Sequence, residues 1–388
     1  MKPFINHIVD HFPQEDLSSL RDQVIVFPSK RACYYFRQAL LTRFSQQTFW
    51  MPRILSIEEF IVFCTGKPVS NEIDLLFMLY QAYSQTYLTP PDGQVDVEDL
   101  PTFDRFYAWG QVLLKDFDEV DRYLVNADEL YRNLEQLRDL EIRYQDNEEV
   151  LRTLKRFNEM LGQEPTSLIT NFSNQWSRVC KTYHQFRKAL EEEGSYYSGM
   201  LYREMADELP ELPFQKVLFA GFNALSKSEE LIFQKLLDRG MATIFWDGDR
   251  LYLEDEVEEA GKFMRRYYRK WPPSAQVHWV VTDMIRDRKS IKLVGGVQST
   301  GQAQVVGHLL QDLSIEEQDN CGIILADEGL LFPLLYALPE NIDKLNVTMG
   351  YPTKHSHWFH LAHAYLEYQI HQRGKGYVET VYVNGLLS

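Results

Sequence analysis

The sequence has few cysteines, and no two of them lie close together along the chain. Its 388 residues include four, Cys33, Cys64, Cys180 and Cys321, which lie far apart and form no C-x-x-C pair. This spacing argues against zinc, an iron-sulfur cluster or a disulfide framework within the chain. We therefore expect buried free thiols.

Long apolar runs are also missing. No stretch approaches the roughly eighteen residues of a membrane span. The N-terminal sequence MKPFINHIVDHF has neither a basic cluster nor a continuous apolar stretch, so no signal peptide is predicted. Hydrophobic residues make up 45% of the chain and aromatic residues 13%, which indicates a folded soluble protein. We expect a cytoplasmic protein with no membrane partner.

Positive charge is scarce overall, because the formal net charge is -16. Nucleic-acid binding depends on Lys and Arg releasing counterions from phosphates, so this balance opposes such a role. The charge is unevenly distributed, however. Residues 115–150 hold twelve acids against five bases, whereas residues 261–290 hold eight bases against two acids. A local basic face therefore remains possible.

A strand, a helix and a second strand are predicted in the middle of the chain. The apolar run 217–220 is too short for a helix, and Ser226 and Glu229 form an S-x-x-E capping box. Gly240 is expected to end the helix at its C′ position. A second apolar run, 242–246, follows closely. The two strands are therefore predicted to be parallel in one sheet, with ligands binding at their carboxyl ends.

This stretch resembles the Walker B and following motifs of UvrD-type superfamily 1 helicases, D-E-F-Q-D-T-N-x-x-Q and G-D-x-D-Q-x-I-Y. Phe222 stands at the family's Phe, but Ala220 and Gly221 replace its two acids. Asp247 and Asp249 can be aligned with the acids of the second motif. Taken together, the motifs most resemble the N-terminal half of the B subunit of AddAB-type helicase-nucleases, in the Bacteroidetes-like form whose helicase domain has lost its ATPase.

Residues 24–44 predict another strand followed by a helix, which Ser29 caps, with one apolar helix face. The residues of that face are Ala32, Phe36, Ala39 and Leu40. The segment resembles motif Ia of the same helicases, V-T-F-T-N-K-A-A-x-x-M, whose loop touches single-stranded DNA. The resemblance implies DNA contacts at Ser29, Lys30 and Arg31. An ordinary capped helix with solvated basic residues is an equal alternative.

The phosphate loop of a helicase, G-x-x-x-x-G-K-[ST], is not found. The first 23 residues contain no glycine, and Gly66-Lys67 is followed by a proline that indicates a turn. The stretch 296–303 has the glycine spacing, but Gln302 and Ala303 replace the Lys and the Ser or Thr. We expect no ATP hydrolysis and no bound cofactor. A degenerate ATPase is the rival enzyme hypothesis.

A long helical stretch is predicted between the strand and helix of 24–44 and the strand that begins at 217. Within it, 114–124 and 194–203 look like segments typical of the AddB-like group. Four of its acids are conceivable metal ligands, but a solvated face at a helix bend is the favoured interpretation; they are Asp116, Asp118, Glu119 and Asp121.

The segment 261–271, GKFMRRYYRKW, alternates bases with rings, which is the composition of grooves that bind single strands. The candidate DNA-binding residues here are Arg265, Arg266, Tyr267, Tyr268, Arg269 and Lys270, with Lys262 and Trp271 beside them. If this stretch and the loop 29–31 face one groove, they form one DNA contact. An amphipathic helix with core rings and solvent-facing bases is the favoured alternative.

The C-terminal part alternates again and resembles the second RecA-like domain of the helicases. Strands are expected at 291–296, 321–326 and 345–349, with helices at 302–313, 328–337 and from about Ser356. Ala326 falls where the family has a phosphate-contacting Arg. Four histidines gather near the end, His355, His357, His360 and His363, of which the last two are spaced to share a metal. Surface and core histidines are the favoured interpretation, so no metal site is predicted.

The expected fold is α/β, with two RecA-like lobes that contain parallel sheets. The first lobe comprises 1–70 and 205–255, interrupted by a helical insertion at 71–204, and a basic connector at 256–290 leads to an incomplete second lobe at 291–388. The chain looks cut at its end. In the resembling family it continues into a PD-(D/E)xK nuclease domain, whose motif is not visible here.

The resemblance implies a catalytically silent helicase-like module of a subunit that repairs DNA double-strand breaks. Its implied partners are DNA, as a single strand or a duplex end, and an AddA-type helicase-nuclease subunit. A purely structural scaffold that docks a partner is the alternative.

Overall fold

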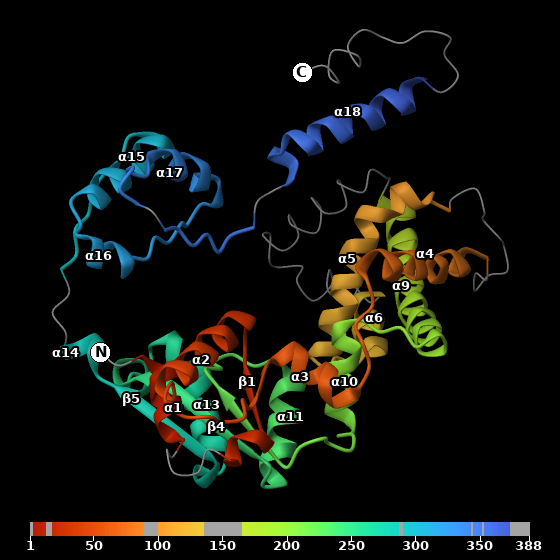
Figure 1. Ribbon diagram of the computed structural model, residues 1–388. Coiled ribbons are helices and arrows are strands. Elements are labelled where there is room, and N and C mark those ends of the chain that lie inside the picture. The colour runs from red at the N-terminus through yellow and green to blue at the C-terminus, as the bar shows by residue number, and fades with distance from the viewer. Residues whose placement is uncertain are drawn as a thin grey trace. The chain divides into compact units, whose positions relative to one another are not determined.

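A computed structural model describes residues 3–12, 18–88, 100–135, 165–286, 290–342, 344–350 and 353–372 (Figure 1). The chain divides into two compact units, Met1–Asp287 and Arg288–Ser388. This division falls close to the boundary expected between the connector and the second lobe.

The first unit is built on a five-stranded, all-parallel sheet with the strand order β2-β1-β3-β4-β5. Its strands are β1 (Gln23–Phe27), β2 (Arg53–Ser56), β3 (Lys216–Ala220), β4 (Ala242–Asp249) and β5 (Gln276–Val281). β3 and β4 pair in parallel, with Val217 opposite Ala242. The predicted α/β class and the parallel pairing of these two strands are confirmed.

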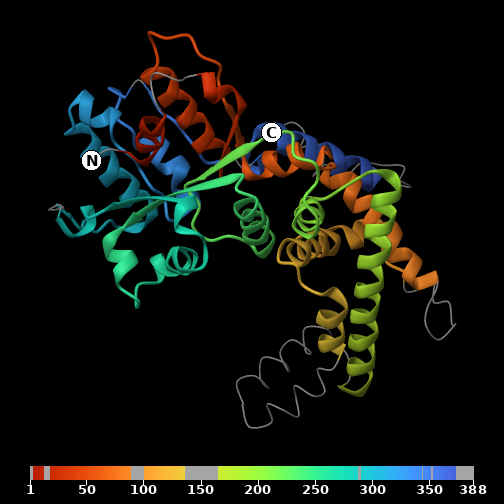
Figure 2. The same ribbon diagram turned by 90° about the horizontal axis from the view of Figure 1, so that it is seen from below.

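Helices cover both faces of this sheet. On one face lie α1 (Phe4–His11) and α2 (Lys30–Arg43); on the other lie α3 (Ile57–Thr65), α10 (Ser198–Asp207), α11 (Lys227–Asp238) and α13 (Lys262–Lys270). In Figure 2 the red helices of the N-terminal segment and the green and teal helices lie on opposite sides of the strands. Two short helices, α12 (Arg250–Glu254) and α14 (Asp283–Arg286), follow β4 and β5.

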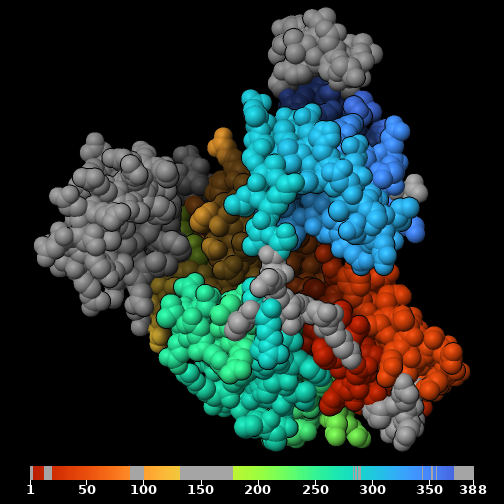
Figure 3. Space-filling model, turned by 90° about the vertical axis from the view of Figure 1, so that its left-hand side faces the viewer, coloured from red at the N-terminus to blue at the C-terminus, as the bar shows by residue number. Residues whose placement is uncertain are grey.

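The N-terminal helix α1 closes the sheet beside β5. The rings of Phe4 and Trp279 meet edge to face with centroids 5.5 Å apart, and His7 lies against the same indole. In the space-filling view the red N-terminal residues lie next to teal residues of the later part of this unit (Figure 3). α1 thereby covers part of one face of the last strand, including Trp279.

The predicted ends of α11 are confirmed in detail. Ser226 accepts a hydrogen bond from the backbone N–H of Glu229, whose carboxylate accepts one from the N–H of Ser226. At the other end Gly240 has φ +67°. The N–H groups of Gly240 and Met241 donate to the carbonyls of Leu237 and Leu236, which is the Schellman arrangement.

β5 belongs to the same sheet and pairs along its length with β4. Sequence analysis placed these residues in a connector between two lobes. In the structure, α13 instead forms the crossover from β4 to β5. The physical reason is that the apolar alternation of 276–281 supplies a half-buried edge strand, with Gln276 buried and His278 exposed.

The predicted helical insertion is present within the first unit. Its described helices are α4 (Glu72–Leu88), α5 (Phe103–Arg122), α6 (Ala127–Glu135) and α9 (Pro165–Glu193). They share a core of their own, which contains Phe106, Phe117 and Phe186. The helices of the insertion therefore pack around a hydrophobic core of their own.

Asp121 ties these helices together at a point with no solvent exposure. Its carboxylate accepts hydrogen bonds from the hydroxyls of Tyr183, at 2.5 Å, and of Tyr197. Two part-buried arginines neutralise it: Arg187 Nη1 lies 2.8 Å and Arg203 Nε 2.6 Å from Oδ1. Burial, together with the charge of Asp121, raises the pKa of Tyr183 to about 12, so this hydroxyl remains a donor.

Asp118, one turn away, is also structural. Its carboxylate accepts from the N–H of Gly199 and pairs with Arg122. A Cβ at Gly199 would lie 2.2 Å from the carbonyl oxygen of Asp118, so this approach of α10 to α5 requires glycine. The favoured interpretation of the four acids as a solvated face is therefore wrong for Asp118 and Asp121, because arginines and tyrosines bind them inside the insertion.

The second unit contains four described α-helices, α15 (Gln298–Gln311), α16 (Ile315–Asp319), α17 (Leu331–Ala337) and α18 (His357–Gln372). The expected helices are thus confirmed, although α15 begins one turn early. Within residues 290–342, 344–350 and 353–372 no strand is assigned, so the three expected strands are not formed. An apolar run supplies strand propensity, but a strand also needs a neighbouring backbone to pair with.

Those apolar segments partly face the helices instead. A cavity of about 650 Å³ is lined by side chains of α15 and α17 and by residues of 321–325 and 345–349. Other side chains of these segments point to solvent, such as Leu293 and Ile324, each 94% exposed. A second parallel sheet is therefore not seen in the described part of this unit.

None of the helices in the described residues combines the length and the apolar character that a membrane span requires.

Replacing Asp121 with Asn should destabilise the protein by about 3 kcal/mol, because Arg187 and Arg203 would keep their charges in a part-buried site without a counter-charge. Urea unfolding followed by far-UV circular dichroism measures this change. The matched control is Glu119→Gln, which alters an exposed acid on the same helix and should change stability by less than about 0.5 kcal/mol. Equal effects of the two substitutions would contradict the assigned role of Asp121.

Candidate nucleic-acid interface

The loop after β1 lies at the carboxyl edge of the sheet, where the resemblance implies DNA contacts. Ser29 is the predicted N-cap of α2, and its hydroxyl accepts from the N–H of Ala32 at 3.3 Å. Lys30 is exposed and its Nζ lies 3.6 Å from Glu59 of α3. Arg31 is exposed, and no ion pair is recorded for it among the described residues. The Ser29 side chain therefore caps α2, whereas the Arg31 side chain is accessible to a ligand.

Helix α2 carries more of this surface than the sequence analysis proposed. Its sequence, KRACYYFRQALLTR, holds four bases and no acid. The predicted apolar face is confirmed, with Phe36 and Leu40 fully buried. The opposite face exposes Tyr34 (54%), Tyr35 (48%) and the side chain of Arg37. This exposed face, formed by Arg31, Tyr34, Tyr35 and Arg37, is called the α2 face below.

Sequence analysis missed Tyr34, Tyr35 and Arg37 although a signal for them was present. The same helical period that assigns positions 32, 36 and 40 to the core leaves positions 34, 35 and 37 outside it. Two adjacent tyrosines on the solvent side of a basic helix are unusual enough to notice. Their rings meet edge to face with centroids 5.6 Å apart, and both remain accessible.

The rings of α13 are not accessible, which corrects the prediction that Tyr267 stacks on bases. Tyr267 is fully buried, and its ring stacks on Trp246 of β4 at 5.7 Å and on Trp271 at 4.7 Å. Its hydroxyl accepts from the N–H of Leu225 at 3.3 Å. Trp271 is 2% exposed. These rings form the hydrophobic core under the sheet, as the alternative interpretation held.

Tyr268 is half-buried and has a similar environment. Its ring lies 4.0 Å from the imidazole of His278 and 5.9 Å from Trp246, centroid to centroid. Burial raises the pKa of its hydroxyl above the ordinary value. The ring packs against Trp246 of β4 and His278 of β5 and is only partly exposed.

Four of the five basic residues of α13 have partners within the protein. Arg265 donates to the backbone carbonyls of Tyr252, Glu256 and Glu258, and so fixes the loop before the helix. Arg269 pairs with Glu256 at 2.8 Å and remains 72% exposed. Neutralisation by an adjacent acid reduces the attraction of such a base for phosphate.

Glu230 of α11 pairs with two further bases of α13, Arg266 and Lys270. This carboxylate is 7% exposed and lies 2.9 Å from Arg266 Nη2 and 2.5 Å from Lys270 Nζ. Burial opposes ionisation of Glu230, but the hydrogen bond from Lys270 and the charges of Arg266 and Lys227 outweigh it. They hold the pKa of Glu230 below its usual value. Arg266 and Lys270 therefore join α13 to α11.

The two predicted parts of the DNA contact lie on opposite faces of the sheet. Cys33 and Phe36 of α2 belong to the core that includes Phe27 and Phe245, whereas Met264 and Tyr267 of α13 belong to the core on the other side. The α2 face and the paired bases of α13 thus do not share one surface. The single groove expected from both stretches is not formed.

β3, the strand next to β1, ends without the two acids of a Walker B motif. β3 ends at Ala220, which is fully buried, followed by Gly221 at φ +74°. Asp249 accepts hydrogen bonds from the N–H groups of Leu251 and Met284, so its carboxylate caps backbone. Asp247 is exposed, and partial burial of its carboxyl group raises its pKa, against the opposing charge of His7.

The glycine-spaced stretch of the second unit is mostly helical. α15 begins at Gln298, so Gln302 lies inside the helix rather than at its first turn. A phosphate loop instead presents successive backbone amides before its helix starts. The helical backbone of this stretch and the replacement of the lysine by Gln302 both differ from a phosphate loop.

The histidines near the C-terminal end lie outside any described ligand group. His357, His360 and His363 belong to α18 and are exposed, and the ring of His363 stacks on Phe359 at 5.9 Å. Residues 351–352, between the last expected strand and the last helix, lie outside the described residues.

Two of the four cysteines match the expectation of buried thiols. Cys33 and Cys64 are buried, and burial raises their pKa to about 11 and about 12, with the charge of Glu59 adding to the effect on Cys33. Cys321 is exposed and Cys180 is half-buried, which differs from the expectation. Cys180 lies on α9, where it is accessible to a ligand.

Acidification should weaken the link between α11 and α13. The pKa of Glu230 in the folded protein is lower than its value of 4.5 in the unfolded chain, so the ionised carboxylate stabilises the fold above pH 4.5. This stabilisation is lost as the pH falls through the lower pKa of the folded state. Replacing Glu230 with Gln should therefore destabilise the protein by about 1 kcal/mol at pH 7, since its partners are half-exposed. The variant should lose less stability than the parent between pH 5 and pH 3.

Urea midpoints across this pH range measure both effects. Glu254→Gln, which breaks only an exposed pair with Arg250, is the matched control and should follow the parent. Identical pH dependence of the Glu230 variant and the parent would contradict the assigned role of Glu230.

Neither a protein-family model nor any curated protein matches this sequence. The resemblance to helicase-nuclease subunits therefore depends on the order of the motifs along the chain. The function has to be argued from the α2 face and from the chemistry of the strand ends.

Proposed function

We propose that this chain is a catalytically silent, helicase-like module of a DNA double-strand-break repair helicase-nuclease subunit, and that it binds single-stranded DNA on the α2 face. The finer fold that accompanies this proposal is a RecA-like lobe built on the five-stranded parallel sheet. The second RecA-like lobe of the expectation lacks its three strands in the described residues. The observation that carries the proposal is the α2 face itself, a basic helix surface with two exposed tyrosines in an otherwise acidic chain.

The charge of the α2 face suits a phosphate backbone. Arg31 and Arg37 are exposed on a helix that has no acid, so their field is not cancelled within the helix. The positive end of the helix dipole adds to this field at Ser29. Local basic surface, rather than net charge, decides where phosphates bind and release counterions. The formal charge of -16 is therefore compatible with binding at this place.

The exposed rings favour a single strand over a duplex. Tyr34 and Tyr35 can stack on bases only when the bases are unpaired, and each stacked base contributes about 1 to 3 kcal/mol. The loop before α2 is also the segment that resembles motif Ia, which touches single-stranded DNA in the helicases. Geometry and resemblance thus favour the same ligand at the same edge of the sheet.

We expect no ATP hydrolysis because the charged groups that it requires are replaced. Ala220 and Gly221 stand where magnesium-binding and water-orienting carboxylates are needed, and Gln302 stands where a lysine is needed. Phosphoryl transfer depends on such charges, and removing a comparable stabilising group commonly costs several kcal/mol of barrier. DNA binding without translocation is the role that remains.

A second candidate function, docking of a partner such as an AddA-type subunit, has an observation of its own. The insertion exposes large apolar side chains on α4 and α5, among them Ile73 (53%), Phe77 (48%), Trp109 (43%) and Val112 (49%). Exposed apolar surface of this kind is typical of protein interfaces. A DNA-binding signal that is absent, or independent of salt, would favour this scaffold function over the first proposal.

Fluorescence anisotropy with a labelled oligothymidine in a salt series tests DNA binding. Changing Arg31 and Arg37 to Ala should weaken binding and reduce the slope of log K against log salt by about 0.7 per lost phosphate contact. Changing Tyr34 and Tyr35 to Ala should cost about 1 to 3 kcal/mol per stacked base with little change in slope.

The controls for these variants are Arg269→Ala and Tyr123→Ala. Arg269 is 72% exposed at its side chain and lies on the other face of the sheet, and Tyr123 has the same exposed fraction as Tyr34, 54%. Both controls should bind as the parent does. Binding that weakens as much in the controls as in the α2 variants would contradict the proposal.

The chain should not hydrolyse ATP above the background of the buffer, with or without DNA. A coupled phosphate-release assay with magnesium measures this, and Gln302→Ala should leave the rate unchanged. Turnover that disappears in the Gln302 variant would instead support the degenerate ATPase.

A further inference from the structure

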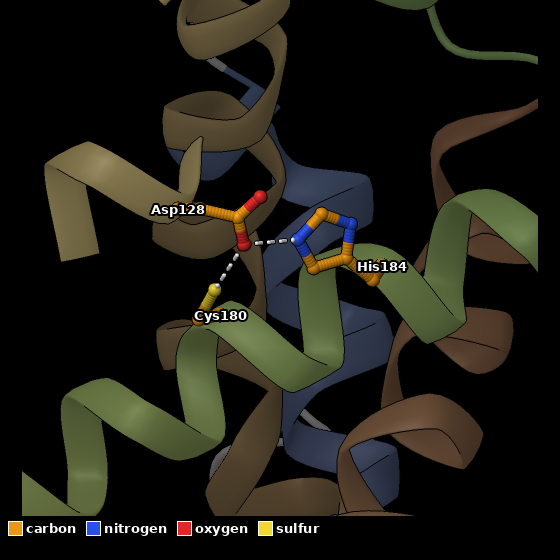
Figure 4. A group of neighbouring side chains, drawn as sticks. All are labelled: Asp128, Cys180 and His184. Atoms are coloured by element: carbon orange, nitrogen blue, oxygen red, sulfur yellow. Dashed lines mark hydrogen bonds and ion pairs between the residues drawn. The ribbon is translucent and has the colours of Figure 1, made fainter. Parts of the chain in front are cut away.

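Three side chains with metal-ligating atoms converge between α6 and α9 of the insertion, away from the α2 face. They are Asp128, Cys180 and His184, and their ligand atoms all lie within 4.8 Å of one another. Figure 4 shows the carboxylate of Asp128 between the sulfur of Cys180 and the ring of His184. Cys180 Sγ lies 3.5 Å and His184 Nε2 lies 2.9 Å from the same oxygen, Asp128 Oδ1.

The three residue types are those that proteins use for zinc. Zn²⁺ binds thiolate at about 2.3 Å, imidazole at about 2.0–2.1 Å and carboxylate at about 2.0–2.2 Å in a tetrahedron. Such bonds place oxygen and sulfur about 3.6 Å apart, and oxygen and nitrogen about 3.3 Å apart. The distances in this structure, 3.5 and 2.9 Å, are within a few tenths of an ångström of those values.

The backbone already holds these side chains on the same side. Cys180 and His184 are four residues apart on α9, so they project from one helix face. Between them Tyr183 is buried and bonded to Asp121, which fixes the rotation of the helix. Asp128 lies in the first turn of α6, where Asn126 accepts a hydrogen bond from its N–H. Small side-chain rotations therefore suffice to complete the ligand set.

The cluster adjoins a solvent-filled hollow lined by both acids and bases. Asp128 and His184 line this pocket of about 500 Å³ together with Arg187, Lys188, Arg203 and Glu191. Arg187 and Arg203 are paired with Asp121. The side chains of Asp128 and His184 are 61% and 52% exposed, so an ion can enter from solvent. Three protein ligands leave one tetrahedral position of zinc open, and water from the pocket can occupy it.

We propose that Asp128, Cys180 and His184 form a zinc site whose fourth position is open to water from the adjoining pocket. On binding, the thiol of Cys180 releases its proton to solvent, and the neutral ring of His184 binds through Nε2 with its proton on Nδ1. Affinity for zinc should fall on acidification, because protons then compete for sulfur and nitrogen. The spacing of the cysteines gave no sign of this site, since only one of them belongs to it.

Metal content and metal titration of the full chain test the site. After removal of metal with a chelator and dialysis, one equivalent of Zn²⁺ should bind per chain, and Co²⁺ in its place should show thiolate-to-metal charge-transfer absorption. Cys180→Ser should abolish that absorption. Loss of a residue that only hydrogen-bonds to a zinc ligand weakens zinc binding by about 10- to 100-fold. Cys180→Ser and His184→Ala should each weaken zinc binding by more than this.

Cys321→Ser is the matched control, because it removes an exposed thiol from the other unit and should leave zinc binding unchanged. Circular dichroism of each variant verifies folding, and the half-exposed His184 can be replaced without disturbing the core. No bound zinc in the parent, or equal binding by the parent, Cys180→Ser and His184→Ala, would overturn the proposal. Loss of binding in Cys321→Ser alone would overturn it as well.

Discussion

An all-parallel sheet must be covered on both faces, and most features of the first unit depend on this constraint. α13 can return the chain from β4 to β5 only by lying against the sheet, and its rings then become core. Tyr267 and Trp271 stack beside Trp246. Three bases of the same helix, Arg266, Arg269 and Lys270, pair with Glu230 or Glu256. The basic-aromatic composition of α13 is therefore explained by its position in the fold.

The same constraint gives α2 its exposed surface. Its apolar side covers the opposite face of the sheet, and its other side is left with arginines and tyrosines in solvent. Since α2 starts at the carboxyl end of β1, this surface lies at the edge where parallel sheets bind ligands. The strand ends nearby carry Ala220 and Gly221, and Asp249 caps backbone.

Much of the local structure could be predicted from the sequence, because it depends on short-range rules. The capping box at Ser226, the C′ glycine at Gly240 and the apolar face of α2 are each encoded within a few residues. The parallel pairing of β3 and β4 followed from the short crossover between them. The strands expected in the second unit were wrong for a different reason, since pairing depends on a partner that local sequence does not specify.

Long-range contacts were the part that the sequence did not reveal. Composition could not show whether the rings of 261–271 are core or surface, because that depends on which face of which sheet the helix covers. Asp121 looked like one acid among many, yet its partners Tyr183 and Arg203 lie more than sixty positions away in the chain. The cluster of Asp128, Cys180 and His184 likewise joins two helices that are distant in sequence.

Hydrogen-deuterium exchange with and without an oligothymidine tests most directly whether α2 forms the DNA-binding surface. Bound DNA should slow the exchange of amides in residues 29–43, and exchange in 262–271 should stay unchanged. Slower exchange confined to 262–271, or no change in 29–43 at saturating DNA, would contradict binding on the α2 face.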